Sequence, residues 1–283
     1  MATYHLRMKN DTKPNGVKVS ARKHVDYIMR EDSKKHAEYI NREGKQNSDC
    51  VYRGEQLPRW ANGSAQKFFE AATRYEDKGN RRYKELELSL PNELTLEQNR
   101  EIVDRFIEAH LKNHYYAYAI HDKKGALSNQ QHPHVHIMFS ERLIDDVEKV
   151  KERPVSRYFK RAAKALKGEE VASFERRREH GAPKDKKWHD KNYLKEIRAD
   201  FAKIQNEVLA KNGFSVRVDH RTLKAQKEEA ERNGDETLVK LYNRKAEKNI
   251  GIIYSHSKNQ ELENLQQYQI YNNTVRCITN VEI

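Results

Sequence analysis

The sequence predicts an α+β domain with a mainly antiparallel sheet and flanking helices. Three observations support this prediction. A strand pattern near the start of the chain is followed by two helical patterns, a second strand pattern is followed by a third helix, and two further strand patterns are joined by a short polar loop. Strands joined by such a loop pair as antiparallel neighbours, so the sheet should be mainly antiparallel.

The first two elements are expected within the first thirty residues. Residues 3–8 alternate apolar and polar side chains, which is typical of a strand. Ser20 then provides an N-cap for a helix over residues 21–30. The apolar residues of this helix recur at helical spacing: Val25, Ile28 and Met29.

Residues 50–80 are harder to place, with an ordered turn at 57–60 and a helix over 65–77 capped by Ser64. Residues 82–91 alternate as a strand that ends at a proline. A helix from Thr95 through Leu111 follows. The two faces of the strand carry Leu86, Leu88 and Leu90 on one side and Glu85, Glu87 and Ser89 on the other.

The hairpin carries the most informative residues. Residues 115–121 and 131–139 read as its strands, and the loop between them, 122–130, contains glycine and asparagine. His134 and His136 share one face of their strand, about 7 Å apart, and His121 ends the preceding strand. Three such imidazoles can converge on one metal ion. The alternative is chance, since 13 histidines in 283 residues make one His-x-His spacing unsurprising.

Two carboxylates could assist the histidines. If the polar face of strand 82–91 is the face that carries the histidines, Glu85 or Glu87 could orient a metal-bound imidazole through its second nitrogen or act as a base. Glu87 is the catalytic candidate of the two. The alternative is that both are solvated carboxylates.

A tandem repeat supplies two candidate nucleophiles. The pattern Lys-His-x-acid-Tyr-Ile-x-Arg-Glu occurs at residues 23–31 and again at 35–43, with Tyr27 and Tyr39 at its centre. On a helix, the histidine and arginine three residues away share the face of the tyrosine, and such cations favour a phenolate. The alternative is an amphipathic helix with a tyrosine packed at its edge and a small duplication.

Composition points to a polyanionic partner. The net charge is +12 and the isoelectric point is near 9.4, which favours nucleic acid first and an anionic membrane surface well behind it. With Cys50 and Cys277 as its two cysteines, the chain has neither a disulfide framework nor a zinc motif. A cytoplasmic location is expected, because the sequence shows no signal-peptide pattern and no apolar run long enough to cross a membrane.

A densely charged region follows the hairpin. Residues 149–191 mix cations with aromatic rings, including the run Arg176, Arg177 and Arg178. This mixture suits a single-stranded nucleic acid, and it would equally suit a solvated loop. A helix over 193–211 with Gly213 beyond its end and a charged helix over 224–250 are expected next.

Several of these segments form an ordered set of motifs. They are His121 followed by His134-Val135-His136, residues 20–28 around Tyr27, Leu57-Pro58-Arg59-Trp60, residues 85–94, Phe139-Ser140-Glu141-Arg142 and residues 218–223. In this order they resemble the MobA/MobL relaxases, which belong to the wider class of His-hydrophobic-His single-strand endonucleases. The resemblance spans Met1 to Gln226. Residues 1–226 are therefore expected to form a relaxase domain, and 227–283 a charged helical extension of unknown role.

The resemblance implies a five-stranded antiparallel sheet of the relaxase or rolling-circle Rep type. It also implies a divalent metal, Mn²⁺ or Mg²⁺, on His121, His134 and His136. A tyrosine would nick single-stranded DNA at a plasmid transfer origin and form a covalent 5′-phosphotyrosine link. Accessory mobilisation proteins and a coupling protein are the implied partners, without membrane insertion.

The resemblance leaves two questions open. The Ser-Ala lead-in supports Tyr27 as the nucleophile, whereas Arg42-Glu43-Gly44 resembles the family sequence after the tyrosine and supports Tyr39. Tyr27 is preferred because its helix follows the first strand directly. A rolling-circle replication initiator and a non-enzymatic DNA-binding accessory protein are the alternative functions.

Overall fold

The computed structural model describes residues 4–11, 20–30, 49–124, 131–150 and 153–243. The chain divides into two units, Met1–Asp219 and His220–Ile283. Among the described residues, no helix combines the length and apolar character that crossing a membrane requires.

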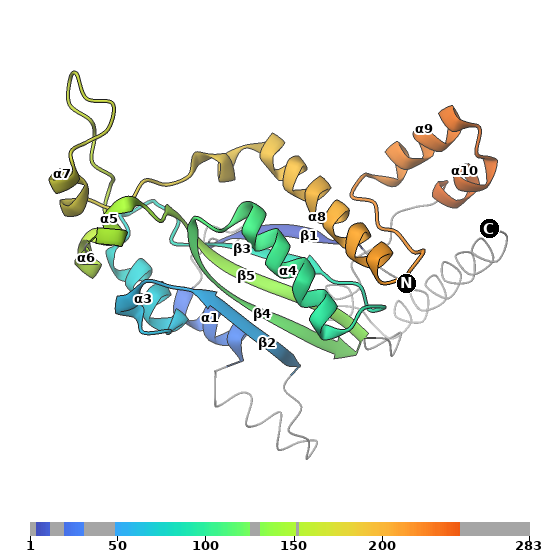
Figure 1. The fold of residues 1–283 in the computed structure, drawn as a ribbon, viewed down its shortest axis with the longest axis horizontal. Helices are drawn as coiled ribbons and strands as arrows, with labels where there is room; N and C mark the ends of the chain where they lie inside the picture. The colour runs from blue at the N-terminus through green and yellow to red at the C-terminus, as the bar shows by residue number, and fades with distance from the viewer. Residues whose placement is uncertain (1–3, 12–19, 31–48, 125–130, 151–152, 244–283) are drawn as a thin grey trace, which may run out of the picture. The chain divides into compact units, whose positions relative to one another are not determined.

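The first unit is built on one five-stranded sheet (Figure 1). Its strands are β1 (Leu6–Asn10), β2 (Cys50–Gln56), β3 (Lys84–Ser89), β4 (His114–Lys124) and β5 (Gln131–Leu143). Their order across the sheet is β1-β3-β5-β4-β2, and every neighbouring pair is antiparallel. The predicted α+β fold with a five-stranded antiparallel sheet is confirmed.

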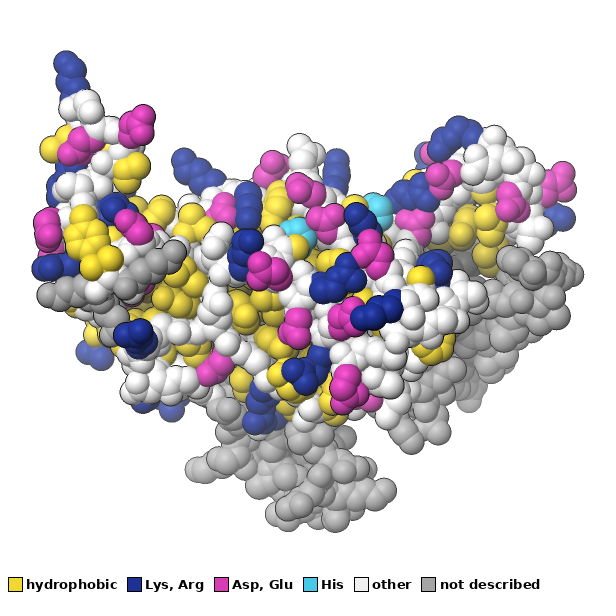
Figure 2. Space-filling model, in the orientation of Figure 1, with side chains coloured by type: hydrophobic (Ala, Val, Ile, Leu, Met, Phe, Trp, Pro, Cys, Tyr) yellow, Lys and Arg dark blue, Asp and Glu magenta, His cyan; other side chains and the backbone are white. Residues whose placement is uncertain are grey.

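One face of the sheet packs under α4 (Leu96–His110) and α8 (Lys191–Lys211) (Figure 1). The alternation of β3 and β5 places their leucines, valine, isoleucine and phenylalanine in this core, as predicted. Thr95 and Gln98 form a capping box that fixes the start of α4. Figure 2 shows basic and acidic side chains intermingled on the outer surface of these helices, so the net positive charge is not concentrated there.

The opposite face packs against α1 (Ala21–Met29) and α3 (Ala65–Tyr75). Ser20 and Ser64 cap these helices as predicted, each accepting a hydrogen bond from a backbone N–H of the first turn. The sheet contributes the small residues Ala117 and Ala119 and the side chain of Met138 to this second core. Small side chains let α1 approach β4 closely, which brings the end of α1 to the histidines.

Two elements differ from the sequence predictions. β2 was not predicted, and it supplies the fifth strand as an edge strand paired only with β4. The predicted helix over 224–250 is broken within its described part, since the second unit contains α9 (Leu223–Asn233) and α10 (Glu236–Tyr242) instead. Gly234 ends α9 with a φ of 71°, and Asp235 caps the start of α10.

Short helices connect β5 to α8. They are α5 (Asp146–Val150), α6 (Val155–Tyr158), α7 (Phe174–Glu179) and η2 (Lys186–His189), whereas the short helix η1 (Arg59–Ala61) precedes α3. Arg142, only 2% exposed, anchors this segment to the sheet. Its guanidinium donates to both carboxylate oxygens of Glu76 and to the carbonyl oxygens of Phe159 and Ala182. Arg142 of the Phe139–Arg142 motif therefore stabilises the fold by holding the segment after β5 in place.

Replacing Arg142 with alanine is expected to destabilise the protein by about 3–5 kcal/mol, because the buried carboxylate of Glu76 loses its bidentate guanidinium partner and two carbonyl groups lose the hydrogen bonds that Arg142 donates. Urea unfolding measures this change. Arg105→Ala is the matched control, since the ion pair of Arg105 with Glu207 is exposed and contributes less than about 1 kcal/mol. Equal losses in the two variants would contradict the anchoring role.

Candidate metal centre

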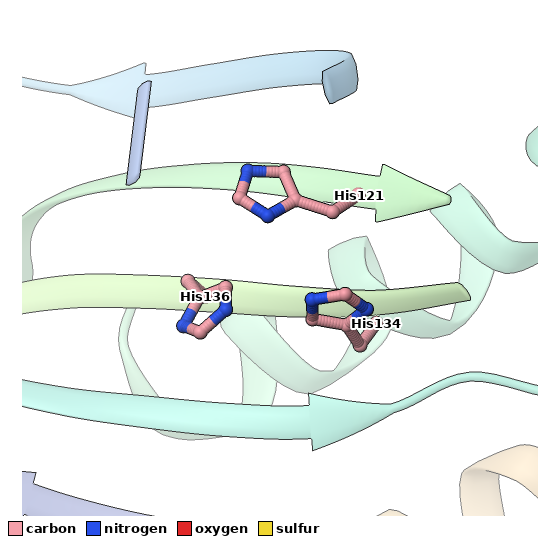
Figure 3. Close-up of side chains that lie close together, drawn as sticks. All are labelled: His121, His134 and His136. Atoms are coloured by element: carbon pink, nitrogen blue, oxygen red, sulfur yellow. The ribbon is translucent and has the colours of Figure 1, made fainter. Parts of the chain in front are cut away.

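Three histidines from two neighbouring strands lie together on the sheet face that packs against α1. His121 of β4 and His134 of β5 are direct cross-strand partners, and His136 lies two positions further along β5 on the same face. The ring centroids lie 5.3, 5.2 and 5.2 Å apart. One ring nitrogen from each histidine lies within 4.8 Å of the others (Figure 3). The structure therefore brings together the three histidines that the hairpin pattern selected.

The second nitrogen of each ring has an acceptor of its own. His136 Nδ1 donates to Glu85 Oε1 at 2.7 Å, and His134 Nδ1 donates to the His132 carbonyl oxygen at 2.8 Å. His121 Nε2 donates to the Ile28 carbonyl oxygen at 2.8 Å. In these tautomers the lone pairs that face the cluster are on Nε2 of His134 and His136 and on Nδ1 of His121. Metal-binding histidines usually donate their other ring N–H to a carboxylate or carbonyl oxygen in this way.

Burial keeps two of the rings in the neutral form that binds metals. Burial, followed by the nearby guanidinium of Arg30, lowers the pKa of His121 to about 4. Burial also lowers the pKa of His134. Three converging ring nitrogens, each oriented by an acceptor, fit a divalent cation with open positions for other ligands. The cluster could therefore hold such an ion.

Glu85 and Glu87 both lie on the histidine face, because Glu87 is the cross-strand partner of His136. Glu85 is only 1% exposed and also accepts a hydrogen bond from His24 Nε2 at 2.8 Å. Burial alone would raise the pKa of Glu85, but the hydrogen bonds from His136 and His24 hold it well below the usual range. Glu87 is half-buried and pairs with Lys9 at 2.6 Å. Glu85 is thus the carboxylate that orients a histidine, and Glu87 lies beside the site.

Replacing Glu85 with glutamine is expected to weaken Mn²⁺ binding by about 10–100-fold, because His136 loses the carboxylate that orients it. Isothermal titration calorimetry measures this change. Glu87→Gln is the control on the same strand face, and its Mn²⁺ affinity should stay within about threefold of the wild-type value. The opposite ranking would assign the orienting role to Glu87.

Tyr27 lies in the last turn of α1 and is 58% exposed. The guanidinium of Arg30 lies 4.7 Å from the centre of its ring, as the helical spacing predicted. His24, the other predicted neighbour, instead stacks on Tyr83 and bonds to Glu85. The ring of Tyr27 is therefore exposed at the end of α1 and is not part of the buried core. Tyr39 lies outside the described residues.

Sequence reasoning missed an ion pair beside the histidines. Arg30 Nε and Nη2 donate to the two carboxylate oxygens of Asp49, both at 2.7 Å. Nη2 of Arg30 also lies 3.4 Å from Nδ1 of His121. The backbone of Arg30 is left-handed, with a φ of 53°, and its N–H caps the end of α1. The tandem repeat contained Arg30, but no pattern connected it to Asp49, nineteen residues away.

The three consecutive arginines of the charged region, Arg176 to Arg178, all have carboxylate partners. Arg176 pairs with Glu169, Arg177 with Asp146, and Arg178 with its neighbours on α7. These pairs offset the positive charge of the three arginines and so reduce what this run offers to a phosphate backbone.

Replacing these three arginines with alanine is expected to flatten the dependence of log DNA affinity on log salt. Each phosphate contact on a single strand contributes about −0.7 to that slope. Because the arginines are already paired, the change should be smaller than the total of about 2 for three full contacts. Fluorescence anisotropy with a labelled single strand measures it, and an unchanged slope would mean that the region is only a solvated surface.

Comparisons with known proteins identify relatives of the chain. A family model described as the MobA/MobL family matches residues 15–237. The chain is 34% identical over 227 residues to a "43 kDa relaxation protein" of Salmonella typhimurium, a match that covers 80% of this chain and 55% of that protein. It is 33% identical over 233 residues to "Mobilization protein A" of Escherichia coli, covering 80% of this chain and 28% of that protein. The chain therefore matches about half and about a quarter of the length of these relatives.

One solved structure is also similar. It is described as "Molecular Basis of Vancomycin Resistance Transfer in Staphylococcus aureus" and shares 23% sequence identity with a TM-score of 0.49. The match covers 78% of this chain and 99% of that one.

Proposed function

Because the chain belongs to the MobA/MobL family, we propose that it is a DNA relaxase that nicks one strand at a plasmid transfer origin for conjugative mobilisation. The observation that carries the proposal is an exposed tyrosine at the end of a helix whose last turn contacts a cluster of three histidines. The relatives are named for relaxation and mobilisation, which agrees with this activity.

The proposed reaction is a transesterification. The hydroxyl oxygen of Tyr27 attacks the scissile phosphorus and loses its proton, the tyrosine–phosphate bond forms, and the bond to the 3′ oxygen breaks. The departing 3′ oxygen takes up a proton, and the 5′ end stays joined to Tyr27. The phosphodiester energy is conserved in this link, so the reverse reaction can rejoin the strand. The exposure of Tyr27 supports this role, because the nucleophile must meet DNA.

In this proposal His121, His134 and His136 hold a divalent cation, Mn²⁺ or Mg²⁺. When bound, such an ion supplies positive charge to the phosphoryl oxygens in the transition state. Imidazole ligands suit Mn²⁺ better than Mg²⁺. Glu85 keeps His136 oriented, and Glu87 is the accessible carboxylate proposed to act as a base near the site.

The wider setting is part of the proposal. Single-stranded DNA at the transfer origin is the substrate, and accessory mobilisation proteins and a coupling protein are the partners, in the cytoplasm. Residues 1–226 form the relaxase domain, and the role of residues 227–283 is not assigned. The net charge of +12 supports a nucleic-acid partner.

The experiment is a search for covalent adducts. The protein is incubated with single-stranded DNA from a plasmid library and Mn²⁺, and DNA that stays attached after denaturation is sequenced. Adducts at transfer origins support the proposal, whereas adducts at replication origins would identify a rolling-circle initiator. Absence of adducts together with absence of Mn²⁺ binding would indicate a non-enzymatic accessory protein.

A further inference from the structure

Arg30 connects three parts of the site. Its Nη1 donates to the carbonyl oxygen of Tyr27 at 2.8 Å, and its Nε and Nη2 hold the carboxylate of Asp49. Its guanidinium also lies over the ring of Tyr27, and Nη2 lies 3.4 Å from Nδ1 of His121. The guanidinium is therefore placed between the proposed nucleophile and one proposed ligand, with its plane fixed by a bidentate ion pair.

The contact with His121 involves the nitrogen that a cation would use. Nε2 of His121 donates to Ile28, so its hydrogen is on Nε2 and its lone pair is on Nδ1. Nη2 of Arg30 is a donor and can only approach that lone pair. A lone pair directed at one partner is not available to another, so Arg30 and a cation compete for the same atom of His121.

The charge of Arg30 acts in the same direction. A guanidinium this close to the histidine cluster repels a divalent ion, and its side chain is only 10% exposed, so water screens the repulsion weakly. The carboxylate of Asp49 offsets part of this repulsion. A phosphodiester anion beside the guanidinium would offset the rest, because it attracts both positive charges.

Building on the proposed relaxase function, we propose that Arg30 is a phosphate-binding residue that couples the substrate to the cation. When the substrate binds, Nη2 of Arg30 stops donating to His121 Nδ1 and donates instead to a non-bridging oxygen of the scissile phosphate. Phosphate and cation therefore each favour the binding of the other. Arginine suits this task because its planar, permanently charged fork binds phosphate while keeping a second partner, here Asp49. No covalent bond of Arg30 changes.

The test measures Mn²⁺ binding to the full chain by calorimetry, with and without dimethyl phosphate as a minimal diester. Arg30→Gln is expected to bind Mn²⁺ about tenfold more tightly without the diester, because the competing donor and the repulsion are both removed. Dimethyl phosphate should tighten Mn²⁺ binding to the wild-type protein and leave the Arg30→Gln protein unchanged. Nicking by Arg30→Gln should nevertheless fall about a hundredfold.

Two controls separate coupling from a structural role. Asp49→Asn removes a negative charge and keeps the guanidinium, so it should weaken Mn²⁺ binding, and the double variant should bind about tenfold more tightly than Asp49→Asn alone. Arg22→Gln alters an exposed arginine of the same helix that pairs with Glu70, and it should match the wild-type protein. If Arg30 only holds α1 in place, Arg30→Gln will weaken Mn²⁺ binding instead, which overturns the proposal.

The outcomes also distinguish this inference from the function on which it rests. If Arg30→Gln binds Mn²⁺ more tightly but the wild-type protein forms no covalent DNA adduct, the relaxase activity is overturned. The competition between Arg30 and the cation for His121 then still stands. Normal nicking by Arg30→Gln would overturn phosphate binding by Arg30 and leave the relaxase activity intact.

Discussion

Tyr27→Phe is expected to abolish the covalent protein–DNA adduct while leaving the affinity for single-stranded DNA nearly unchanged. Phenylalanine keeps the ring, including its contact with the guanidinium of Arg30, and removes only the oxygen that would attack phosphorus. Gel analysis of adducts under denaturing conditions measures the first quantity, and fluorescence anisotropy measures the second.

Tyr39→Phe is the matched control, because Tyr39 occupies the same position in the second copy of the repeat. This variant should keep most single-turnover nicking. Peptide mapping of the wild-type adduct decides between the two residues. DNA attached to Tyr39 alone would overturn the assignment of Tyr27, and attachment at both would make this a two-tyrosine enzyme.

Alanine at His121, His134 or His136 is expected to weaken Mn²⁺ binding and to lower the nicking rate at least about tenfold. Each variant removes one of three nitrogen ligands, and two ligands hold a divalent ion less tightly than three. Calorimetry and adduct formation are measured on the same protein samples. His180→Ala serves as the control, because that exposed ring bonds only to a backbone carbonyl of α7 among the contacts described. Metal-dependent cleavage by a triple variant would place the metal site elsewhere.

Local patterns predicted the part of the site that depends on strand alternation. The period of two in β5 determined that His134 and His136 face away from Val135 and Ile137, which are buried in the first core. The polar loop before β5 determined that His121 lies beside them. Neither inference needs information from distant parts of the chain, which is why the sequence was sufficient.

Other parts of the site depend on contacts between distant segments. Glu85 and Glu87 share a face and both pair with Lys9 of β1. What distinguishes Glu85 is the hydrogen bonds that it accepts from His24 of α1 and from His136 of β5. β2 was missed because an edge strand needs no apolar face. It also includes Gly54, where any residue with a Cβ atom would place that atom 2.4 Å from the ring of Tyr118. β2 does alternate between half-buried and exposed residues, but its half-buried positions include Gly54 and Gln56, so the alternation is not one of apolar and polar side chains.

The order of the strands has a consequence for how long the site keeps its shape. The histidines are on β4 and β5, and both strands have a hydrogen-bonded neighbour on each side. Their amide hydrogens should therefore exchange with solvent only when most of the sheet opens, whereas the amide hydrogens of the edge strands β1 and β2 should exchange sooner. The proposed reaction, in which a cut strand is held until it is rejoined, would need a site with a long lifetime, and an interior position in the sheet provides one.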